Sequence, residues 1–279
     1  MLQALPEVLF LASVAAGFVG AMSGMGGGVV LIPALTLLGM DIKQAIAISI
    51  VSVVATSSGA ASAYVRDRLT NLKVGMFLEM FTIVGALAGA SLTLLVPEQP
   101  LFVAFGLVLL GTWTTLLFQP QAGQPSTAHQ DGFTRWLDCD GSYYDQVCGQ
   151  TVQYYAVRAY LGGPLMCGAG LIAGLLGVGA GAIKVLIFDV AMGLPPKVAT
   201  TTSNLIIGVT ALAGTSVYLA SGLIDPGLAA PVILGILLGA FLGTRLLVRL
   251  RNQAIRRFFL VVLLALGVEM LVRGVRGVL

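Results

Sequence analysis

The chain has 279 residues, of which 57% are hydrophobic and only 10% are charged, and its formal net charge is +3 at pH 7. Soluble domains carry about 25% charged residues, so this composition excludes an ordinary soluble protein. The small net charge gives no indication of a nucleic-acid partner. Apolar runs of about 18 residues or more recur along the chain, and they predict helices that cross a lipid bilayer.

We expect two membrane units, residues 1–118 and 159–279, joined by a linker. Residues 119–158 are polar and rich in Gly, Pro, Asp and Tyr, which predicts that the linker is exposed to solvent. Each unit has a long glycine-rich segment followed by three single spans. These cover residues 8–38, 44–64, 73–96 and 101–118 in the first unit, and residues 160–192, 198–221, 228–247 and 257–272 in the second.

Each glycine-rich segment has a length that suits neither one span nor two. A continuous helix of about 31 residues would be ~46 Å long, against a hydrocarbon core of ~30 Å, whereas two full spans need ~40 residues. Two shorter helices that meet at the glycines, in a broken or re-entrant hairpin, fit best. Non-helical backbone at that depth is tolerated only where protein buries it or where it lines a wet cavity.

The two units are copies of one sequence pattern. The glycines of the first copy recur 153 positions later, and after one inserted residue the match continues at an offset of 154. Chance matches would scatter over many offsets, so we expect two copies of one structural unit. The matched pairs include Gly17 with Gly170, Gly24 with Gly177, Gly28 with Gly181, Gly39 with Gly193, Ser49 with Ser203, Thr56 with Thr210 and Gly85 with Gly239.

Basic residues predict that the two copies face opposite sides of the membrane, because Lys and Arg favour cytoplasmic loops. The loop after the first single span carries Arg66, Arg68 and Lys73, whereas its counterpart around Asp225 has no Lys or Arg. The next loop, residues 97–100, has no basic residue. Its counterpart carries Arg245, Arg249, Arg251, Arg256 and Arg257.

Inverted repeats need an odd number of crossings per repeat. Three single spans plus a glycine segment that returns to its own side provide that number. This scheme places the linker and Lys197 in the cytoplasm and the N-terminus outside. Lys43, Arg273 and Arg276 fall on the outer side and count against it.

The strongest functional signal is the pair of glycine clusters. A break in a helix frees backbone N–H groups, and glycine lets these groups approach an anion closely. Paired broken helices near the bilayer centre are typical of transporter sites. The structural alternative is tight packing of helices through small residues. The candidate substrate-binding glycines are Gly24, Gly26, Gly27, Gly28, Gly177, Gly179 and Gly181.

Hydroxyl groups on the helices after the clusters are further candidates for substrate binding. Ser49, Ser52 and Thr56 share one helix face by their spacing, and so do Ser203 and Thr210. With the amide of Asn204, they would hold an oxyanion without a full charge. The alternative for each hydroxyl is an interhelical hydrogen bond, worth about 0.6 kcal/mol on average.

Lys184, Glu79 and Glu269 are charged residues of the predicted membrane segments that could have a function. Lys184, whose first-copy counterpart is Leu31, is a candidate counter-charge for an anionic substrate. The alternative pairs it with Asp189 or lets it snorkel to an interface. Glu79 is expected near an interface. Glu269 is a candidate proton carrier, or else a carboxylate that a neighbouring helix neutralises.

The linker contains Asp140-Gly141 between residues that favour strands, which predicts a small β-hairpin. Its acidic residues lack the full EF-hand spacing and its cysteines lack a C-x2-C pair, so we expect no metal site. The sequence shows no nucleophile–base pair, HExxH motif or P-loop, and we expect neither an enzyme nor a cofactor. The ligands considered are Asp138, Asp140, Asp145, Cys139, Cys148 and His129.

The glycine motif followed by Pro33, its second copy, and the hydroxyl-rich helix after each resemble the TauE/SafE family, whose members are linked to export of sulfite, sulfoacetate and related sulfur anions. The resemblance covers nearly the whole chain, and residues 140–145 resemble the DGxYYD insert of part of that family. It implies a two-repeat transporter with its substrate between the glycine segments. The chain departs from the family pattern at Ala180 and Leu186, which implies a second half-site of different shape.

The sequence therefore predicts an all-α polytopic membrane protein that acts as a secondary transporter by alternating access. We expect it to export a small sulfur-containing oxyanion, such as sulfite, thiosulfate or an organosulfonate, across a bacterial inner membrane. Proton coupling and a homodimer are both compatible with the sequence. Two alternatives stay open: an anion channel, and a sensor or scaffold that acts through the linker.

Accessibility labelling tests the inverted topology in a variant without the three native cysteines. The cysteine of Arg68→Cys should react with an impermeant reagent only from the cytoplasm, and that of Gly222→Cys only from outside. Labelling of both positions from one side would contradict inverted repeats.

Overall fold

The computed structural model describes residues 6–23, 27–66, 70–118, 132–137, 139–145, 150–247 and 252–277. Most of them are helical, and the expected all-α membrane architecture is confirmed. The elements are α1 (Pro6–Ser23), α2 (Gly28–Leu37), α3 (Ile42–Arg66), α4 (Leu72–Leu95), α5 (Glu98–Phe118), α6 (Gly132–Trp136), β1 (Gly141–Asp145), β2 (Gln150–Tyr154), α7 (Ala159–Leu176), α8 (Gly181–Leu186), the π-helix η2 (Ile187–Ala191), α9 (Pro196–Ala220), α10 (Pro226–Leu247) and α11 (Asn252–Arg276).

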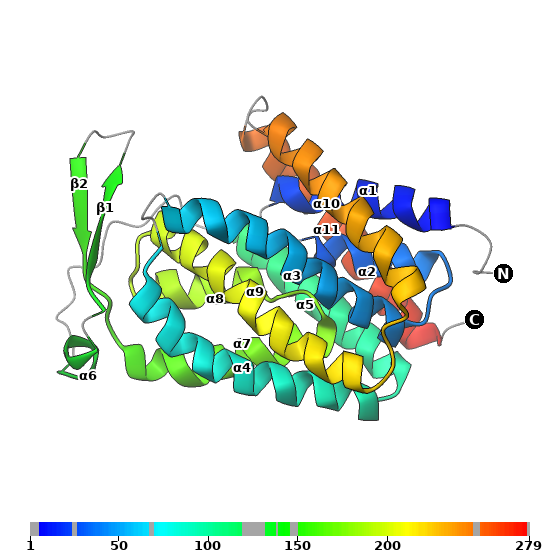
Figure 1. The fold of residues 1–279 in the computed structure, drawn as a ribbon, viewed down its shortest axis with the longest axis horizontal. Coiled ribbons are helices and arrows are strands. Elements are labelled where there is room, and N and C mark those ends of the chain that lie inside the picture. The colour runs from blue at the N-terminus through cyan, green and yellow to red at the C-terminus, as the bar shows by residue number, and fades with distance from the viewer. Residues whose placement is uncertain are drawn as a thin grey trace.

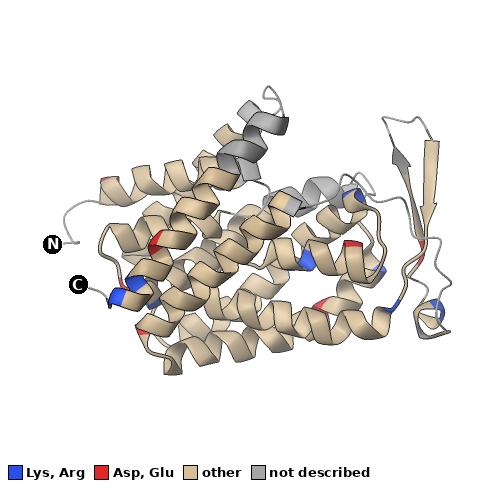
Figure 2. Cartoon of the chain, turned by 180° about the vertical axis from the view of Figure 1, so that it is seen from behind, with Lys and Arg blue, Asp and Glu red and all other residues tan. Residues whose placement is uncertain are grey.

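Five helices of the described chain are long and apolar enough to cross a membrane, namely α4, α5, α7, α9 and α10. Shorter apolar helices lie in α1, α2 and α3. Many large apolar side chains on the outer surface are exposed, among them Val84, Leu95 and Leu212. Lys, Arg, Asp and Glu gather mainly towards the two ends of the bundle (Figure 2). This distribution suits a bundle surrounded by lipid.

The two halves of the chain run in opposite directions. In Figure 1, α3 and α9 lie against each other with opposite colour gradients along the bundle, and α10 runs opposite to α4. The start of α1 and the end of α11 lie at one end of the bundle, and the β-hairpin lies at the other. Each element of the second half is therefore inverted relative to its counterpart, as the distribution of basic residues predicts.

The halves are interlocked. Helix α1 packs along α10, and its counterpart α7 packs along α4, while α3 pairs with α9 and α5 with α11. Each glycine-bearing helix thus lies against a helix of the other half. This reciprocal exchange is the pattern that a two-fold axis between the halves produces.

Glycine allows these exchanged pairs to touch through their backbones. A Cβ added to Gly85 would overlap the carbonyl oxygen of Cys167, and one added to Gly239 would overlap that of Val14. Gly85 matches Gly239 at the offset of 154, and Val14 matches Cys167 at the offset of 153. The same backbone contact therefore occurs in both halves, which supports the repeat found in the sequence.

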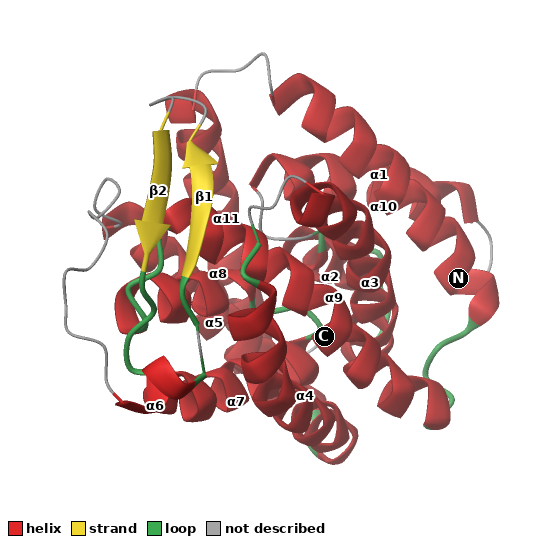
Figure 3. Ribbon diagram, turned by 60° about the vertical axis from the view of Figure 1, so that its left-hand side comes forward, coloured by secondary structure: helices red, strands yellow, loops and turns green. Residues whose placement is uncertain are grey.

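A small antiparallel β-hairpin is present in the linker, as expected. Gly141 pairs with Tyr154 and Asp145 pairs with Gln150, so Asp140-Gly141 lies at the start of β1 and not at the turn. The hairpin stands at one end of the bundle (Figure 3). Asn71, the N-cap residue of α4, donates from Nδ2 to the Cys139 carbonyl and to the Tyr154 hydroxyl, both at 3.1 Å. These bonds attach the hairpin to the membrane helices.

No group of three or more potential metal ligands occurs among the described residues. Three of the considered ligands, His129, Asp138 and Cys148, lie outside the described residues. Cys139 is buried, and its Sγ donates to the Leu137 carbonyl at 3.8 Å.

Gly85→Ala should destabilise the protein by about 1–3 kcal/mol, because the added methyl meets the backbone of α7, which cannot move aside. The measurement is the midpoint of thermal unfolding in detergent. Gly168→Ala on α7 is the matched control, because nothing lies within 4 Å of its added Cβ. The control should match or exceed wild-type stability, since Ala favours helix by about 1 kcal/mol. Equal unfolding midpoints for Gly85→Ala and Gly168→Ala would refute the close contact at Gly85.

Candidate functional site

The first glycine segment is interrupted between α1 and α2. Gly24 and Gly26 lie outside the described residues, whereas Gly27 is a buried turn residue and Gly28 begins α2. Helix α2 has 10 residues and packs back against α1. This is the broken, returning segment expected from its awkward length, because ten residues span only ~15 Å.

The second segment breaks at the matching place. Helix α7 ends at Leu176, and three of the next four residues adopt left-handed backbone angles before α8 begins at Gly181. These are Gly177, Gly179 and Ala180, with φ of 64°, 72° and 48°. Ala180 stands where the first copy has Gly27, so an alanine holds a conformation that normally favours glycine.

The two breaks meet. An added Cβ on Gly28 would lie 2.8 Å from Ser49 Oγ and 2.9 Å from the carbonyl oxygen of Gly177. Ser49 donates its hydroxyl to that same carbonyl at 3.1 Å. Glycine at position 28 is thus required for the close approach, and Ser49 of the first half holds the second half's break.

Hydroxyl groups satisfy the carbonyl side of the second break. Helix ends leave carbonyls without intrahelical partners, and such groups are costly inside a membrane. Tyr218 donates to the Gly174 carbonyl at 2.6 Å, and Thr93 donates to the Leu175 carbonyl at 2.8 Å. Together with Ser49 on Gly177, these donors come from α9, α4 and α3, so three helices cap one break.

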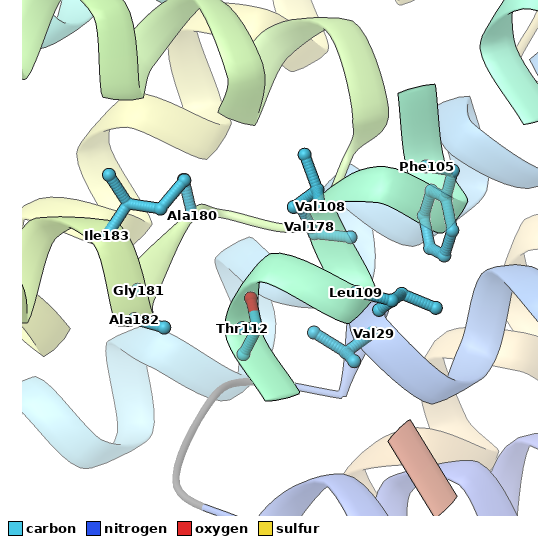
Figure 4. A pocket seen from close by; sticks show the side chains of 10 residues that line it. All are labelled: Val29, Phe105, Val108, Leu109, Thr112, Val178, Ala180, Gly181, Ala182 and Ile183. Carbon is cyan, nitrogen blue, oxygen red and sulfur yellow. The ribbon is translucent and has the colours of Figure 1, made fainter. Parts of the chain in front are cut away.

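The start of α8, on the amide side of the same break, borders a cavity that is partly open to its surroundings. It is lined by the start of α8, by α5 and by one residue of α2, as Figure 4 shows. The first amides of a helix have no intrahelical acceptor, so this wall can offer N–H donors within an otherwise apolar cavity. The lining residues are Val29, Phe105, Val108, Leu109, Thr112, Val178, Ala180, Gly181, Ala182 and Ile183.

The other predicted hydroxyls divide into two groups. Ser52 and Thr56 donate to carbonyls of their own helix, at 3.0 Å from Ile48 and 3.1 Å from Ser52 respectively. Ser203 donates across to the Gly181 carbonyl at 3.3 Å, as its counterpart Ser49 does to Gly177. The half-buried Asn204 lies beside it on α9. The serine pair is therefore tied to the breaks, whereas Ser52 and Thr56 form local helix bonds here.

Lys184 is fully buried and does not snorkel to an interface. Its Nζ donates to Thr210 Oγ1 at 2.6 Å, and that hydroxyl lies 2.8 Å and 3.0 Å from the two carboxylate oxygens of Glu79. The Thr82 hydroxyl also bonds Glu79. The partner of Lys184 is therefore Glu79, reached through Thr210, and not Asp189.

The structure adds to the expectation for Glu79. Glu79 is 1% exposed and faces the bundle interior, because α4 packs against α7 and α9. Counting residues from the start of the span indicates depth along the helix but not the direction of the side chain. A signal did exist in the repeat: the position matching Glu79 is Ile233, and the position matching Lys184 is Leu31. Neither charge has a charged counterpart in the repeat, which indicates that the two belong together.

The second half-site also differs in backbone shape. Helix α2 is a regular α-helix that contains Pro33, whereas α8 continues into the π-helix η2. The extra residue that changes the repeat offset from 153 to 154 lies between Gly181 and Gly193. Single-residue insertions in helices produce π-bulges, often at functional sites. The expected asymmetry between the half-sites is thus visible in the helix type.

Comparison with known proteins gives a family. The model described as sulfite exporter TauE/SafE matches residues 9–270. The chain belongs to this family. The match includes both glycine clusters, the cavity and the Glu79–Lys184 pair. This TauE/SafE protein is therefore a membrane transporter and not an enzyme.

Curated relatives are named as probable membrane transporter proteins. YunE of Bacillus subtilis is 25% identical over 276 residues, which cover 96% of this chain and 98% of YunE. YfcA of Escherichia coli K12 is 24% identical over 264 residues, which cover 95% of this chain and 88% of YfcA. No solved structure matches the chain significantly. The similarity thus extends over most of each relative's length.

Gly28→Ala should weaken substrate binding at the junction of the breaks. The added methyl would press on Ser49 Oγ, which can rotate, and on the Gly177 carbonyl, which belongs to the backbone. We expect the affinity for the transported substrate to fall by about tenfold, because a misfit of ~1.4 kcal/mol in binding free energy corresponds to that factor. Binding is measured by calorimetry on purified protein.

The control for this prediction is Gly111→Ala on α5, where nothing lies within 4 Å of the added Cβ. It should bind like the wild type. If Gly28→Ala binds equally well, the junction of the breaks is not part of the site.

Proposed function

We propose that this TauE/SafE transporter exports a small sulfur-containing oxyanion, such as sulfite, thiosulfate or an organosulfonate, by alternating access. The observation that carries the proposal is the meeting of two broken helices inside the bundle, with a cavity on the amide side of one of them. The family description, sulfite exporter, supports the substrate class.

The chemistry of the second break favours an anion. Its carbonyls already accept bonds from Tyr218, Thr93 and Ser49, so the negative ends of these dipoles are turned towards hydroxyl donors. Its amides begin α8 at the cavity wall, and Lys184 follows directly after the lining residue Ile183. A small oxyanion would exchange its water for N–H donors near a positive charge.

The arrangement of the halves supports alternating access. The cavity lies at the second break, between α8 and α5. Because the halves are inverted and repeat each other's contacts, an exchange of their conformations would move access to the opposite side. In this proposal the β-hairpin and linker lie in the cytoplasm, and the membrane is the bacterial inner membrane.

The test is a flux panel in proteoliposomes with sulfite, thiosulfate, sulfoacetate, taurine and sulfate. We expect saturable flux of at least one sulfur oxyanion and acceleration by the same anion on the opposite side, which a channel does not show. Absence of flux for every compound would refute the proposed substrate class. Flux without counterflow would favour the anion channel.

Lys184→Met should reduce the affinity for the transported anion by about tenfold or more, because a buried opposite charge is lost. The half-saturation concentration in the same vesicles measures this effect. Lys197→Met is the control, since Lys197 is exposed at the start of α9. Unchanged affinity in Lys184→Met would give Lys184 a structural role only.

A further inference from the structure

We propose that Glu79 is the proton-binding group of this transporter and that it shares Lys184 with the substrate anion. The inference rests on the proposed function, because it assigns a role to a carboxylate next to the anion site. In the empty protein Glu79 neutralises Lys184 through Thr210. When an anion arrives, it takes over Lys184 and Glu79 takes a proton.

The pair is not needed for the fold. Buried charges in a membrane are costly and rare, and they usually mark ion or proton pathways. The symmetry-related arrangement has Ile233 of the second half and Leu31 of the first half at the matching positions. Thr56 is the counterpart of Thr210, so among these three positions only the two charged ones differ between the related arrangements. A cost that one arrangement avoids and the other retains points to function.

The pair also connects the parts that must move. Glu79 lies on α4 of the first half, whereas Lys184 and Thr210 lie on α8 and α9 of the second half. The residue before Lys184, Ile183, lines the cavity together with Ala182 and Gly181. A change in partner for Lys184 therefore acts both on the cavity wall and on the contact between the halves.

Lys184 is the charged group that acts on Glu79. Helix α4 packs against α7 and α9, and α8 with η2 lies next to α9. The Thr82 and Thr210 hydroxyls bond the carboxylate directly. The other titratable groups described on these elements are Lys73 on α4, Tyr160 and Cys167 on α7, Asp189 on η2, and Lys197 and Tyr218 on α9.

The charges balance in each state. The empty state holds the Lys184 ammonium and the Glu79 carboxylate, with a sum of zero. The loaded state holds the same ammonium, a monovalent anion and a protonated Glu79, again with a sum of zero. The proton comes from the water on the side where the anion enters, and it leaves with the anion. One proton thus accompanies each monovalent anion.

The first test measures proton uptake on binding. Calorimetry of methanesulfonate and of sulfite with purified protein is repeated in buffers of different ionisation enthalpy. Methanesulfonate is the anion of a strong acid and carries no proton itself. We expect uptake of about one proton per bound methanesulfonate in the wild type and none in Glu79→Gln, whose amide resembles the protonated acid. Sulfite itself titrates near neutral pH, so its calorimetry measures binding and not the proton taken up by Glu79.

The second test measures transport by Glu79→Gln in proteoliposomes. Exchange of anion for anion should continue and become independent of pH, because the loaded state stays neutral. Net flux should fall by at least about tenfold, because the empty variant must return with an unpaired buried lysine. Glu269→Gln is the matched control. Glu269 lies within a helix but is ion-paired with Arg273 at 2.9 Å, and its replacement should leave proton uptake unchanged.

The outcomes separate the two proposals. Methanesulfonate binding without proton uptake, or uptake with methanesulfonate that persists in Glu79→Gln, overturns the role of Glu79 and leaves the proposed function standing. Binding of neither anion overturns both. If Glu79→Gln does not fold, Glu79→Ile combined with Lys184→Leu, which introduces the residues found at the matching positions 233 and 31, should fold and bind neither anion. Proton-linked binding by that double variant overturns the inference.

Discussion

The fold depends on direct contact between the backbones of α4 and α7, and of α1 and α10. At these contacts a backbone carbonyl of one helix occupies the space that a Cβ would need on the neighbouring helix, so that helix has glycine there. Lipid tails are as apolar as the helix surfaces, so close packing rather than exclusion of water drives such association. The absence of a Cβ at Gly85 and Gly239 permits the contact. Because the helices pair across the two halves, the packing of each half depends on the other.

This packing explains how a membrane protein can bury two unwound segments. Broken backbone inside a bilayer needs partners for its polar groups. Ser49, Thr93 and Tyr218 provide these partners at the second break, and each comes from a helix that the exchanged packing brings there. The breaks are therefore supported from outside their own segments. The hydroxyls that look like substrate ligands in the sequence serve partly as caps.

Repetition and charge in the sequence were sufficient to predict the fold. The glycine offset predicted two copies, the placement of Arg66 and Lys73 predicted their inversion, and the segment lengths predicted the broken helices. Arg273, which counted against the topology, pairs with Glu269 and donates to the Thr36 carbonyl at the end of α2. Its position therefore follows from local bonding. The presence of Leu186 predicted a second half-site of different shape, but the sequence did not predict the π-helix.

The candidate site was predicted less completely. Lys184 was singled out from depth alone, but its partner was not, because Glu79 lies 105 positions away in the chain and on the other half. Periodicity shows which residues share a face of one helix and says nothing about which helix that face meets. Only the three-dimensional exchange of helices brings Glu79, Thr210 and Lys184 together. The cavity escaped prediction for the same reason, since α5 supplies much of its lining.

The reciprocal packing of α1 and α10 has a consequence for synthesis in the cell. The ribosome delivers α1 to the membrane more than 200 residues before α10 exists. Until then the surface of α1 that packs against α10 has no partner, and α4 likewise lacks its partner until α7 is made. The early half must therefore remain in the bilayer as a loosely associated set of helices, and maturation is complete only when the last helices arrive.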